Sequence, residues 1–439
     1  MDFITYAKQA MKEALPGIIG SYSGEIKASD ISEMERDIKQ VGQAVGNELM
    51  KQWLEAQDEQ YPSATRPCRC GGRAEYVRRR EGMSITLQGR VYYQRAYYVC
   101  PECGQGHYPL DEQLGIRPGE MSEEVVKQAA LLGVQDAFGT AHDILKELTL
   151  LELSPSSIHK ASLMTGERIL GQEEELKQHS QSLDRQLEQR RRADKPTRLY
   201  GSLDGFMVPL EDGWHEMKAG TWWTTRQRRD GSLAAQDITY YVDLLSAEQF
   251  SDLVWARGFE RQADQAQELI FVADGARWIW DIVERHFPQA VQIVDWYHAC
   301  QYLAPVAQVA GDTPPERAAW LEQTTADLWK GHLAEVIAAC SEHIRPHLNP
   351  EDDPAQRAVT YYSNNRHRMD YPAYRDQGYM IGSGSMESGC KQLGSQRLKI
   401  AGARWSPDGA RKLAKARAAY LSGSWLDITP YRPAFLQAA

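Results

Sequence analysis

Apolar residues recur along this chain at two different spacings, and the changes between them mark its parts. Residues 1–60 carry apolar residues at helical spacing, as in ISEMERDIKQVGQAVGNELMKQWLEAQ, which predicts two amphipathic helices. Residues 66–117 contain alternating stretches such as SITLQGRVYYQRAYYVC, rich in Thr, Val and Tyr, which is typical of strands. Residues 120–170 return to helical spacing. The chain is therefore predicted to open with helices, followed by a small β region and further helices.

The helical stretch that follows the β region ends in the pattern of a helix-turn-helix. One helix is predicted from about Ala141 to Leu150. After a short turn, Ser154 is expected to cap a second helix that has Pro155 at its first position. The second helix of such a pair can enter the major groove of DNA. The same pattern is common in ordinary helical bundles, so that alternative stays open.

A mixed sheet is predicted after Pro196. Three strand-like stretches come first, RLYGSLDGFMVPL, MKAGTWWTT and DITYYVDLL, and a helix is expected around GFERQADQAQELI. A buried strand, 269–273, then ends at Asp274 before a helix, and a further strand ends at Asp295 before another helix. Strongly amphipathic sequence at about 300–378 predicts an all-helical insertion. Three strands followed by alternating helices and strands predict an RNase H-like mixed sheet with helices on both faces.

Four of the seven cysteines fall in the β region. Cys68 and Cys70 precede the predicted strands, Cys100 and Cys103 follow them, and a glycine follows each pair. Four thiolates on two turns are typical of a zinc ribbon, which holds one structural Zn²⁺. The first pair is spaced C-x-C rather than C-x-x-C, which leaves His107 as a substitute ligand. The alternative is four free buried thiols, whereas a disulfide framework is not expected in a cytosolic chain with an odd cysteine count.

Together these elements predict a multidomain α+β protein. Its parts, in chain order, are an N-terminal helical region (1–60), a zinc ribbon (61–118), a helix-turn-helix DNA-binding region (119–170), a basic linker helix (171–198) and an RNase H-like catalytic domain (199–430) that contains the helical insertion. The composition, 42% hydrophobic and 25% charged, is that of a soluble globular protein. We find no apolar run of membrane-spanning length and no signal-peptide pattern, so a cytoplasmic location is expected.

Basic residues are clustered even though the net charge is −10. From Lys391 to Arg417 there are eight Lys and Arg against one Asp, and from Arg185 to Arg198 six against two acids. An acidic chain argues mildly against a nucleic-acid partner, but the distribution of charge carries more weight than the sum. Each cluster alone could be a solvated face. The residues predicted to contact DNA phosphates are Lys391, Arg397, Lys399, Arg404, Arg190, Arg191 and Arg192.

Three acids have the places of a metal-binding group in the predicted domain. In an RNase H-like sheet, a carboxylate of the first strand lies beside one at the end of the fourth, and a third comes from a later helix; Asp204, Asp274 and Glu387 have those places. Clustered carboxylates repel one another unless cations neutralise them, and two Mg²⁺ ions about 4 Å apart would do so in phosphodiester chemistry. Asp295 is a rival third acid, and His298 follows it by one helical turn in a supporting or structural role. The alternative makes Asp204 and Asp274 ordinary turn acids.

The chain resembles bacterial insertion-sequence transposases of the ISKra-four family and, distantly, the Mutator-like group, over roughly residues 66–430. The resemblance rests on YYVCPECGQGHYPLDEQLGI, SLDG, VADGARWIW, IVDWYHACQYL, IGSGSMESGCKQ and RLKIAGARWSPDGA, in this order. It implies that Asp204, Asp274 and Glu387 stand where the family has its DDE catalytic acids. The first 60 residues have no counterpart that we can match.

By this resemblance the protein is expected to be a DDE transposase. It would bind double-stranded DNA at terminal inverted repeats as a homodimer or larger assembly near the nucleoid, and would cut and join DNA with two Mg²⁺ ions. Two other functions remain open at this stage. One is a transposon-derived regulator that binds DNA without catalysis, and the other is an RNase H-like structure-selective nuclease.

Overall fold

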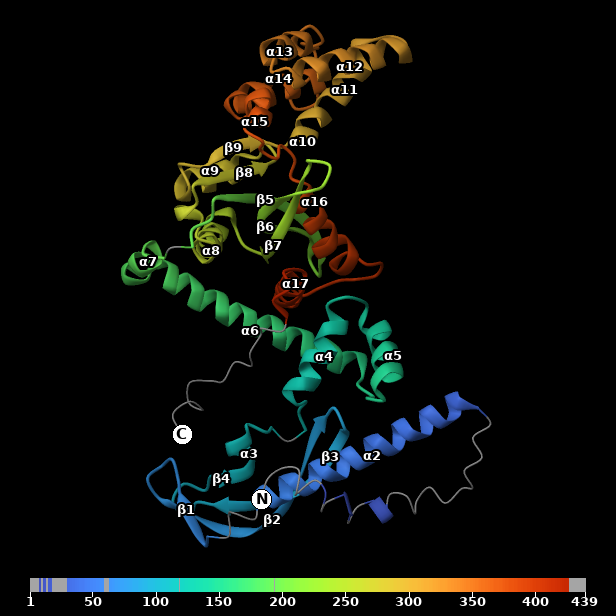
Figure 1. The fold of residues 1–439 in the computed structure, drawn as a ribbon, viewed down its shortest axis with the longest axis vertical. Helices are drawn as coiled ribbons and strands as arrows, with labels where there is room; N and C mark the ends of the chain where they lie inside the picture. The colour runs from blue at the N-terminus through green and yellow to red at the C-terminus, as the bar shows by residue number, and fades with distance from the viewer. Residues whose placement is uncertain are drawn as a thin grey trace. The chain divides into compact units, whose positions relative to one another are not determined.

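The computed structural model describes residues 30–58, 63–117, 119–192 and 194–425, together with positions 8, 11–12 and 15–17. These residues form helices and two β-sheets, which confirms the prediction of a chain with both α and β structure (Figure 1). The chain divides into two compact units, Met1–Met164 and Thr165–Ala439. Across the described ranges, no helix has both the length and the apolar character of a membrane span.

The first unit contains a small antiparallel sheet in the order β1-β2-β3-β4. Its helices and strands are α2 (Ile31–Asp58), β1 (Thr65–Pro67), β2 (Arg73–Thr86), β3 (Gly89–Val99), β4 (Gly106–His107) and α3 (Pro109–Leu114). Helix α2 protects the edge of β3, because the backbone N–H of Gln94 donates to Glu55 at 2.8 Å and that of Ala96 donates to Asp58 at 3.0 Å. Of the two helices predicted before residue 60, the first falls mostly outside the described residues.

Three helices follow in the first unit, namely α4 (Glu123–Gly133), α5 (Phe138–Thr149) and the beginning of α6 (Pro155–Gln181). The predicted pair of helices is present, with Pro155 at the first position of α6 and the hydroxyl of Ser154 accepting from the N–H of Ser157 at 3.2 Å. The left-handed Leu150, with φ 60°, ends α5. Helix α6 runs on without a break, although the sequence placed a boundary after residue 170.

The second unit is built on a mixed sheet in the order β7-β6-β5-β8-β9. Its strands are β5 (Arg198–Leu210), β6 (Gly213–Gln227), β7 (Leu233–Asp243), β8 (Glu268–Ala273) and β9 (Val291–Val294). Strand β6 is antiparallel to β5 and β7, whereas β8 and β9 run parallel to β5. Helix α8 (Ala247–Glu260) connects β7 to β8, and α9 (Arg277–His286) connects β8 to β9. This succession of three strands and then alternating helices and strands is the one predicted from the sequence, but α8 lies at Ala247–Glu260 and not around GFERQADQAQELI, where its helix was expected.

The strands of this sheet follow from their side chains. Strand β8 reads ELIFVA and is buried from its second residue onward, as expected of a parallel strand covered on both faces. Helix α8 begins with a capping box formed by Ser246 and Gln249. Aromatic rings fill the core beside the sheet, where Trp222 lies edge-on to Phe271 and Phe287 at 5.2 and 5.5 Å.

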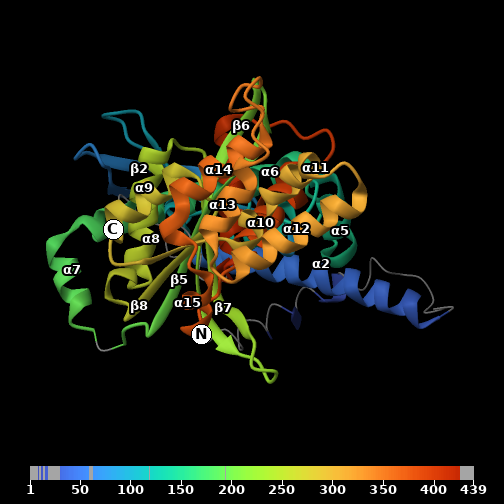
Figure 2. The same cartoon turned by 90° about the horizontal axis from the view of Figure 1, so that it is seen from above.

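A helical segment follows β9, where the sequence predicted an insertion. It consists of α10 (Trp296–Gln301), α11 (Leu303–Ala310), α12 (Pro314–Trp329), α13 (Leu333–Ser341), α14 (Pro354–Asn365) and α15 (Tyr371–Asp376). Figures 1 and 2 show these helices gathered together, and Figure 1 shows the group next to β8 and β9. The chain then returns to the sheet through α16 (Gly384–Cys390), a π-helix η3 (Lys391–Leu398) and α17 (Pro407–Leu421), and α17 packs against β7.

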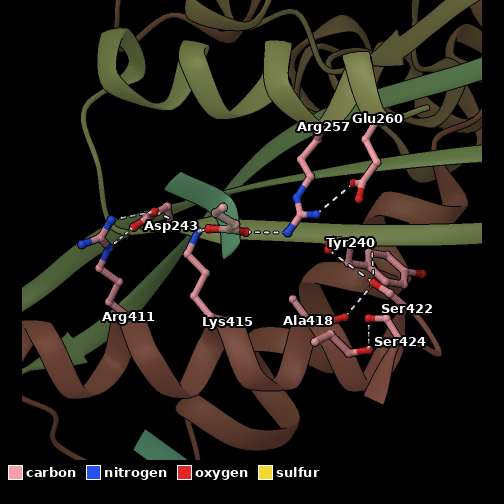
Figure 3. Close-up of polar contacts among 11 residues, drawn as sticks. Tyr240, Asp243, Arg257, Glu260, Arg411, Lys415, Ala418, Ser422 and Ser424 are labelled. Carbon is pink, nitrogen blue, oxygen red and sulfur yellow. Dashed lines mark hydrogen bonds and ion pairs between the residues drawn. The ribbon is translucent and has the colours of Figure 1, made fainter. Parts of the chain in front are cut away.

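A buried network of charges joins helices α6, α8 and α17 to strand β7 within the second unit. Lys415 of α17 lies between Glu173 of α6 and Asp243 at the end of β7, with Asp243 at 2.8 Å. Arg411 also pairs with Asp243 at 2.6 Å, and Arg257 of α8 pairs with Glu173 at 2.8 Å (Figure 3). Helix α7 (Leu183–Arg190) follows α6. The network therefore fixes the second half of α6 to the edge of the sheet.

Candidate functional site

An aspartate within β5 and the aspartates that directly follow β8 and β9 lie level with one another. Gly201 of β5 pairs with Phe271 of β8, and the same register carried forward brings Asp204 level with Asp274. The register of β8 with β9 in turn brings Asp274 level with Asp295. Asp204 lies within the long strand β5, at the level where its shorter neighbours end. Ligands of open α/β sheets bind at the carboxyl ends of such strands, so this row marks a candidate site.

Glu387 reaches the same region from α16. A cavity of about 220 Å³ opens beside β5, and its walls include Asp204, Asp295, His298, Glu387, Lys391 and Lys399. The side chain of Glu387 is 61% exposed, and Lys391 Nζ donates to its Oε1 at 2.7 Å. This pairing lowers the pKa of Glu387. Glu387 therefore borders the cavity in its ionised form but is held by a lysine rather than by the aspartates.

Asp204 and Asp274 are half-buried, and their surroundings disfavour the charged form of each carboxyl. Burial raises the pKa of Asp204, the negative charge of Asp274 raises it further, and hydrogen bonds from Gly205 and Cys390 oppose the rise. Burial likewise raises the pKa of Asp274, against the N–H of Ala276, which donates to it at 2.9 Å. Carboxylates in such surroundings would be stabilised by a bound cation.

The three acids do not share one coordination shell in this structure. Among the described residues, the four cysteines form the one group of three or more Cys, His, Asp or Glu side chains close enough to hold a metal ion together. His298 lines the cavity together with Asp204 and Glu387, whereas Asp274 is not among the residues of its walls. Asp204 and Glu387 therefore border one cavity and Asp274 lies level with Asp204, but the three carboxylates do not meet around one ion.

Asp295 has a structural role in this arrangement. It is 2% exposed, and its carboxylate accepts from the backbone N–H of His298 at 2.9 Å and from that of Ser383. The first bond caps α10 and the second ties α10 to the segment before α16. The sequence offered a structural pair of Asp295 and His298 as one alternative. The structure realises it through the backbone of His298 and leaves the imidazole facing the cavity.

The predicted DNA contacts divide into accessible and buried residues. Lys391 and Lys399 line the cavity, and Arg404 and Arg190, Arg191 and Arg192 are exposed. Arg397 is 1% exposed and lies 5.3 Å from the centre of the Trp405 ring, so the prediction that it holds a DNA phosphate was wrong. Its hydrophobic stem and planar guanidinium pack in the core beneath the π-helix instead.

Two further residues of the site were missed in the sequence. The thiol of Cys390 donates to Asp204 Oδ2 at 3.4 Å. Glu216 of β6 lies over Gly205 and acts on the pKa of Asp274, and it pairs with Lys218 at 2.5 Å. The spacing of Cys390 from Glu387, about one helical turn, was a signal for the first. Nothing in the sequence singles out the second.

The four predicted zinc ligands come together in the first unit. Cys68 and Cys103 are 3.6 Å apart, Cys70 and Cys100 are 3.7 Å apart, and all four sulfur atoms lie within 4.8 Å of one another. Such separations suit four sulfurs arranged about one ion at about 2.3 Å. Without an ion the four thiols share hydrogen bonds, and these lower the pKa of Cys100 while they raise the pKa of Cys70 and Cys103. These cysteines could therefore hold a metal ion such as zinc.

His107 stands beside this group rather than within it. Its Nε2 is 3.3 Å from Cys68 Sγ, and its Nδ1 is 3.2 Å from a carboxylate oxygen of Glu112. The short C-x-C turn closes through Gly71, which has φ +92°, and through the N–H of Cys68, which donates to the carbonyl of Gly72 at 2.8 Å. The turn thus brings both of its sulfurs into the group without a substitute ligand.

Comparison with known proteins yields a family and several bacterial relatives. Two UPF0236 proteins of Caldanaerobacter subterraneus subsp. tengcongensis are each 23% identical to this chain. One alignment covers 88% of this chain and 77% of the relative, and the other covers 89% and 79%. The name of the first joins eleven locus designations. A family model described as an uncharacterised protein family, UPF0236, matches residues 27–429, and the chain therefore belongs to this family.

Proposed function

We propose that this protein is the DDE transposase of an insertion sequence, an enzyme that cuts DNA at the ends of the element and joins them to a target. The observation that carries the proposal is the level placement of Asp204 and Asp274 on adjacent parallel strands. The strand order β7-β6-β5-β8-β9, with the first three strands antiparallel, supports an RNase H-like domain. Glu387 supplies a third acid, and it borders the same cavity as Asp204.

The donor set suits Mg²⁺, which prefers oxygen ligands. Asp204, Asp274 and Glu387 would hold two such ions, and bound Mg²⁺ would activate a hydroxyl and stabilise the leaving oxygen of a phosphodiester. Glu387 must first leave Lys391. Their exposed pair on one helix contributes only about 0.3–0.5 kcal/mol, so a small gain at the aspartates would be enough to turn the carboxylate.

The relatives support a mobile element. One relative's name carries eleven locus designations from a single organism, and another carries four. A protein encoded at many positions of one genome is what repeated transposition would leave behind. A conserved nuclease or a regulator would give no such reason for many copies.

The remaining predicted parts take their places in this proposal. The beginning of α6 is the second helix of the predicted helix-turn-helix, and its exposed surface would read the terminal repeat. Lys391 and Lys399 would hold phosphates beside the acids, and the exposed arginines 190–192 would extend this contact. Two or more chains would assemble on the paired ends of the element.

The test of the proposal is a reaction of the full chain with Mg²⁺ and DNA that contains the boundary of its own element. A transposase is expected to produce 3'-hydroxyl ends at the boundary and to join them to a second duplex. Binding at the boundary without any cut would replace the proposal by the non-catalytic regulator. Cuts that follow DNA structure rather than the boundary, with no joined product, would replace it by the nuclease.

We also propose that the four cysteines hold one structural Zn²⁺. The cluster of buried residues around them is small, consisting of Cys68, Ala74, Ala96, Tyr98 and Cys100. The ion would therefore supply much of the stability of this end of the sheet, as in other small zinc domains.

Replacing Cys100 by serine is expected to remove this zinc. The purified wild type should contain one zinc per chain, whereas Cys100→Ser should retain less than about a tenth of it, because a hydroxyl is a poor ligand for zinc. Cys300→Ser is the matched control, since Cys300 lies outside the group. Metal analysis of both variants decides the matter, and full zinc content in Cys100→Ser would contradict the assignment.

A further inference from the structure

We propose that Cys390 is a positioning residue of the cleavage reaction, whose thiol orients the Asp204 carboxylate toward a divalent cation. This inference rests on the proposed function, because it concerns the metal-binding role of Asp204. It adds a residue that neither the three acids nor the lysines account for. Cys390 ends α16, about one turn after Glu387, and lines the same cavity.

Both oxygens of Asp204 have a donor within the protein. Oδ1 accepts from the backbone N–H of Gly205 at 2.7 Å, and Oδ2 accepts from Cys390 Sγ at 3.4 Å. Two donors on opposite oxygens fix the rotation of the carboxylate plane. Each oxygen keeps further lone-pair capacity for a cation.

Close packing holds Cys390 in place above Asp204. Its neighbour Gly389 lies so near the Tyr240 ring that a Cβ there would be 2.5 Å from a ring carbon. On the other side of Cys390, in η3, a Cβ at Gly394 would be 2.9 Å from the ring of Phe206. Phe206 lies on the same face of β5 as Asp204. The backbone on both sides of Cys390 therefore rests directly on the sheet, which keeps this residue beside Asp204.

A thiol suits this position because it is a weak donor. The Cys390 thiol approaches Asp204 Oδ2 no closer than 3.4 Å, as a weak donor does. A lysine or arginine here would neutralise Asp204 and compete with a cation, as Lys391 does at Glu387. Residues that orient a ligand in this way typically change metal affinity by about 10- to 100-fold when removed.

The experiment compares Mn²⁺ binding to the full chain, measured without DNA by the electron paramagnetic resonance of free Mn²⁺. Cys390→Ala is expected to bind Mn²⁺ about tenfold more weakly than the wild type. The Mg²⁺ concentration for half-maximal cleavage should rise by a similar factor, while saturating Mg²⁺ restores the wild-type rate. Ser388→Ala is the matched control, because Ser388 lies on the same helix and is exposed.

A second variant covers the case in which Cys390→Ala does not fold. Cys390→Ser keeps a hydroxyl donor, so it should bind Mn²⁺ more tightly than Cys390→Ala. If the alanine variant is unfolded, the Mn²⁺ affinity of Cys390→Ser should lie within about tenfold of the wild-type affinity. Unchanged Mn²⁺ affinity in the alanine variant, or a reduced cleavage rate that saturating Mg²⁺ does not restore, would overturn the positioning role alone. A wild type that neither binds Mn²⁺ nor cleaves would overturn the proposed function as well.

Discussion

Replacing Asp204 by asparagine is expected to reduce cleavage at the element boundary by roughly a thousandfold or more while DNA binding persists. The amide lacks the negative charge that a divalent cation requires, and it replaces one of the two aspartates that lie level on adjacent strands. The cavity lysines and the helix-turn-helix are unchanged in this variant. Cleavage and joining assays, together with binding to the labelled boundary, separate these two effects.

The same substitution is expected to leave the fold as stable as before or more so. The pKa of Asp204 is raised by burial and by Asp274, which means that the folded protein disfavours the charged form. Above the folded pKa, the unpaired charge therefore costs stability, and a neutral amide removes this cost. The amide oxygen can still accept from the N–H of Gly205. A variant that is inactive yet thermally stable is what a residue kept for chemistry should give.

Asp212→Asn supplies the matched control for this variant. Asp212 carries the same charge in the exposed turn between β5 and β6, where it contacts His215 at 2.9 Å. Its cleavage rate should equal that of the wild type. An Asp204→Asn protein that cuts at the normal rate, or that no longer binds the boundary, would remove Asp204 from the catalytic group.

The sequence predicted the sheet and the positions of its acids because those features are local. A buried apolar run that stops at an aspartate and a glycine, as β8 does at Asp274, marks both a strand and its end. Once the order of strands is known, the parallel register places Asp204 beside Asp274. The turn at Ser154 and Pro155 was predictable for the same reason, since capping depends on neighbouring residues.

The fate of the basic cluster was not predictable, because it depends on partners far away in the chain. Eight basic residues between 391 and 417 resemble a surface for DNA. In the fold, Lys415 and Arg411 instead meet Asp243 and Glu173, while Arg417 is 5% exposed. Counting charges cannot distinguish a solvated arginine from one that joins a buried pair. The orientation of the Glu387 side chain could not be predicted from the sequence either, because its pair with Lys391, one turn away, sets it.

The second large effect is expected at the buried charge network, where Glu173→Gln should lower the free energy of unfolding by about 3–5 kcal/mol. Glu173 is 3% exposed and receives both Lys415 and Arg257. Once Glu173 has lost its charge, the ammonium of Lys415, which is 1% exposed, keeps only Asp243 as an acidic partner in this network. Asp243 also pairs with Arg411, so it compensates the charge of Lys415 only in part. Denaturant unfolding of the full chain measures the loss.

A double variant isolates the pair from the rest of the network. Glu173→Leu with Lys415→Met removes both charges, whereas Arg257 keeps Glu260 at 2.9 Å and Asp243 keeps Arg411 at 2.6 Å. It should recover most of the stability that Glu173→Gln loses, because no buried charge is then left without a partner. Glu167→Ala is the control on the same helix. Its pair with Lys412 is exposed, so it should change stability by less than about 1 kcal/mol.

The pH dependence of stability gives an independent check on this network. Burial opposes ionisation of Glu173 and Asp243, but Lys415 together with Arg257 and Arg411 outweighs it and holds the pKa of both carboxyls below the ordinary values. A lowered pKa contributes stability that is complete above the ordinary carboxyl range and is lost as the pH falls through the folded values. The wild type should therefore lose stability steeply below about pH 4, and the double variant less steeply. Equal acid sensitivity in the two proteins would mean that the Glu173–Lys415 pair does not hold α6 against the sheet.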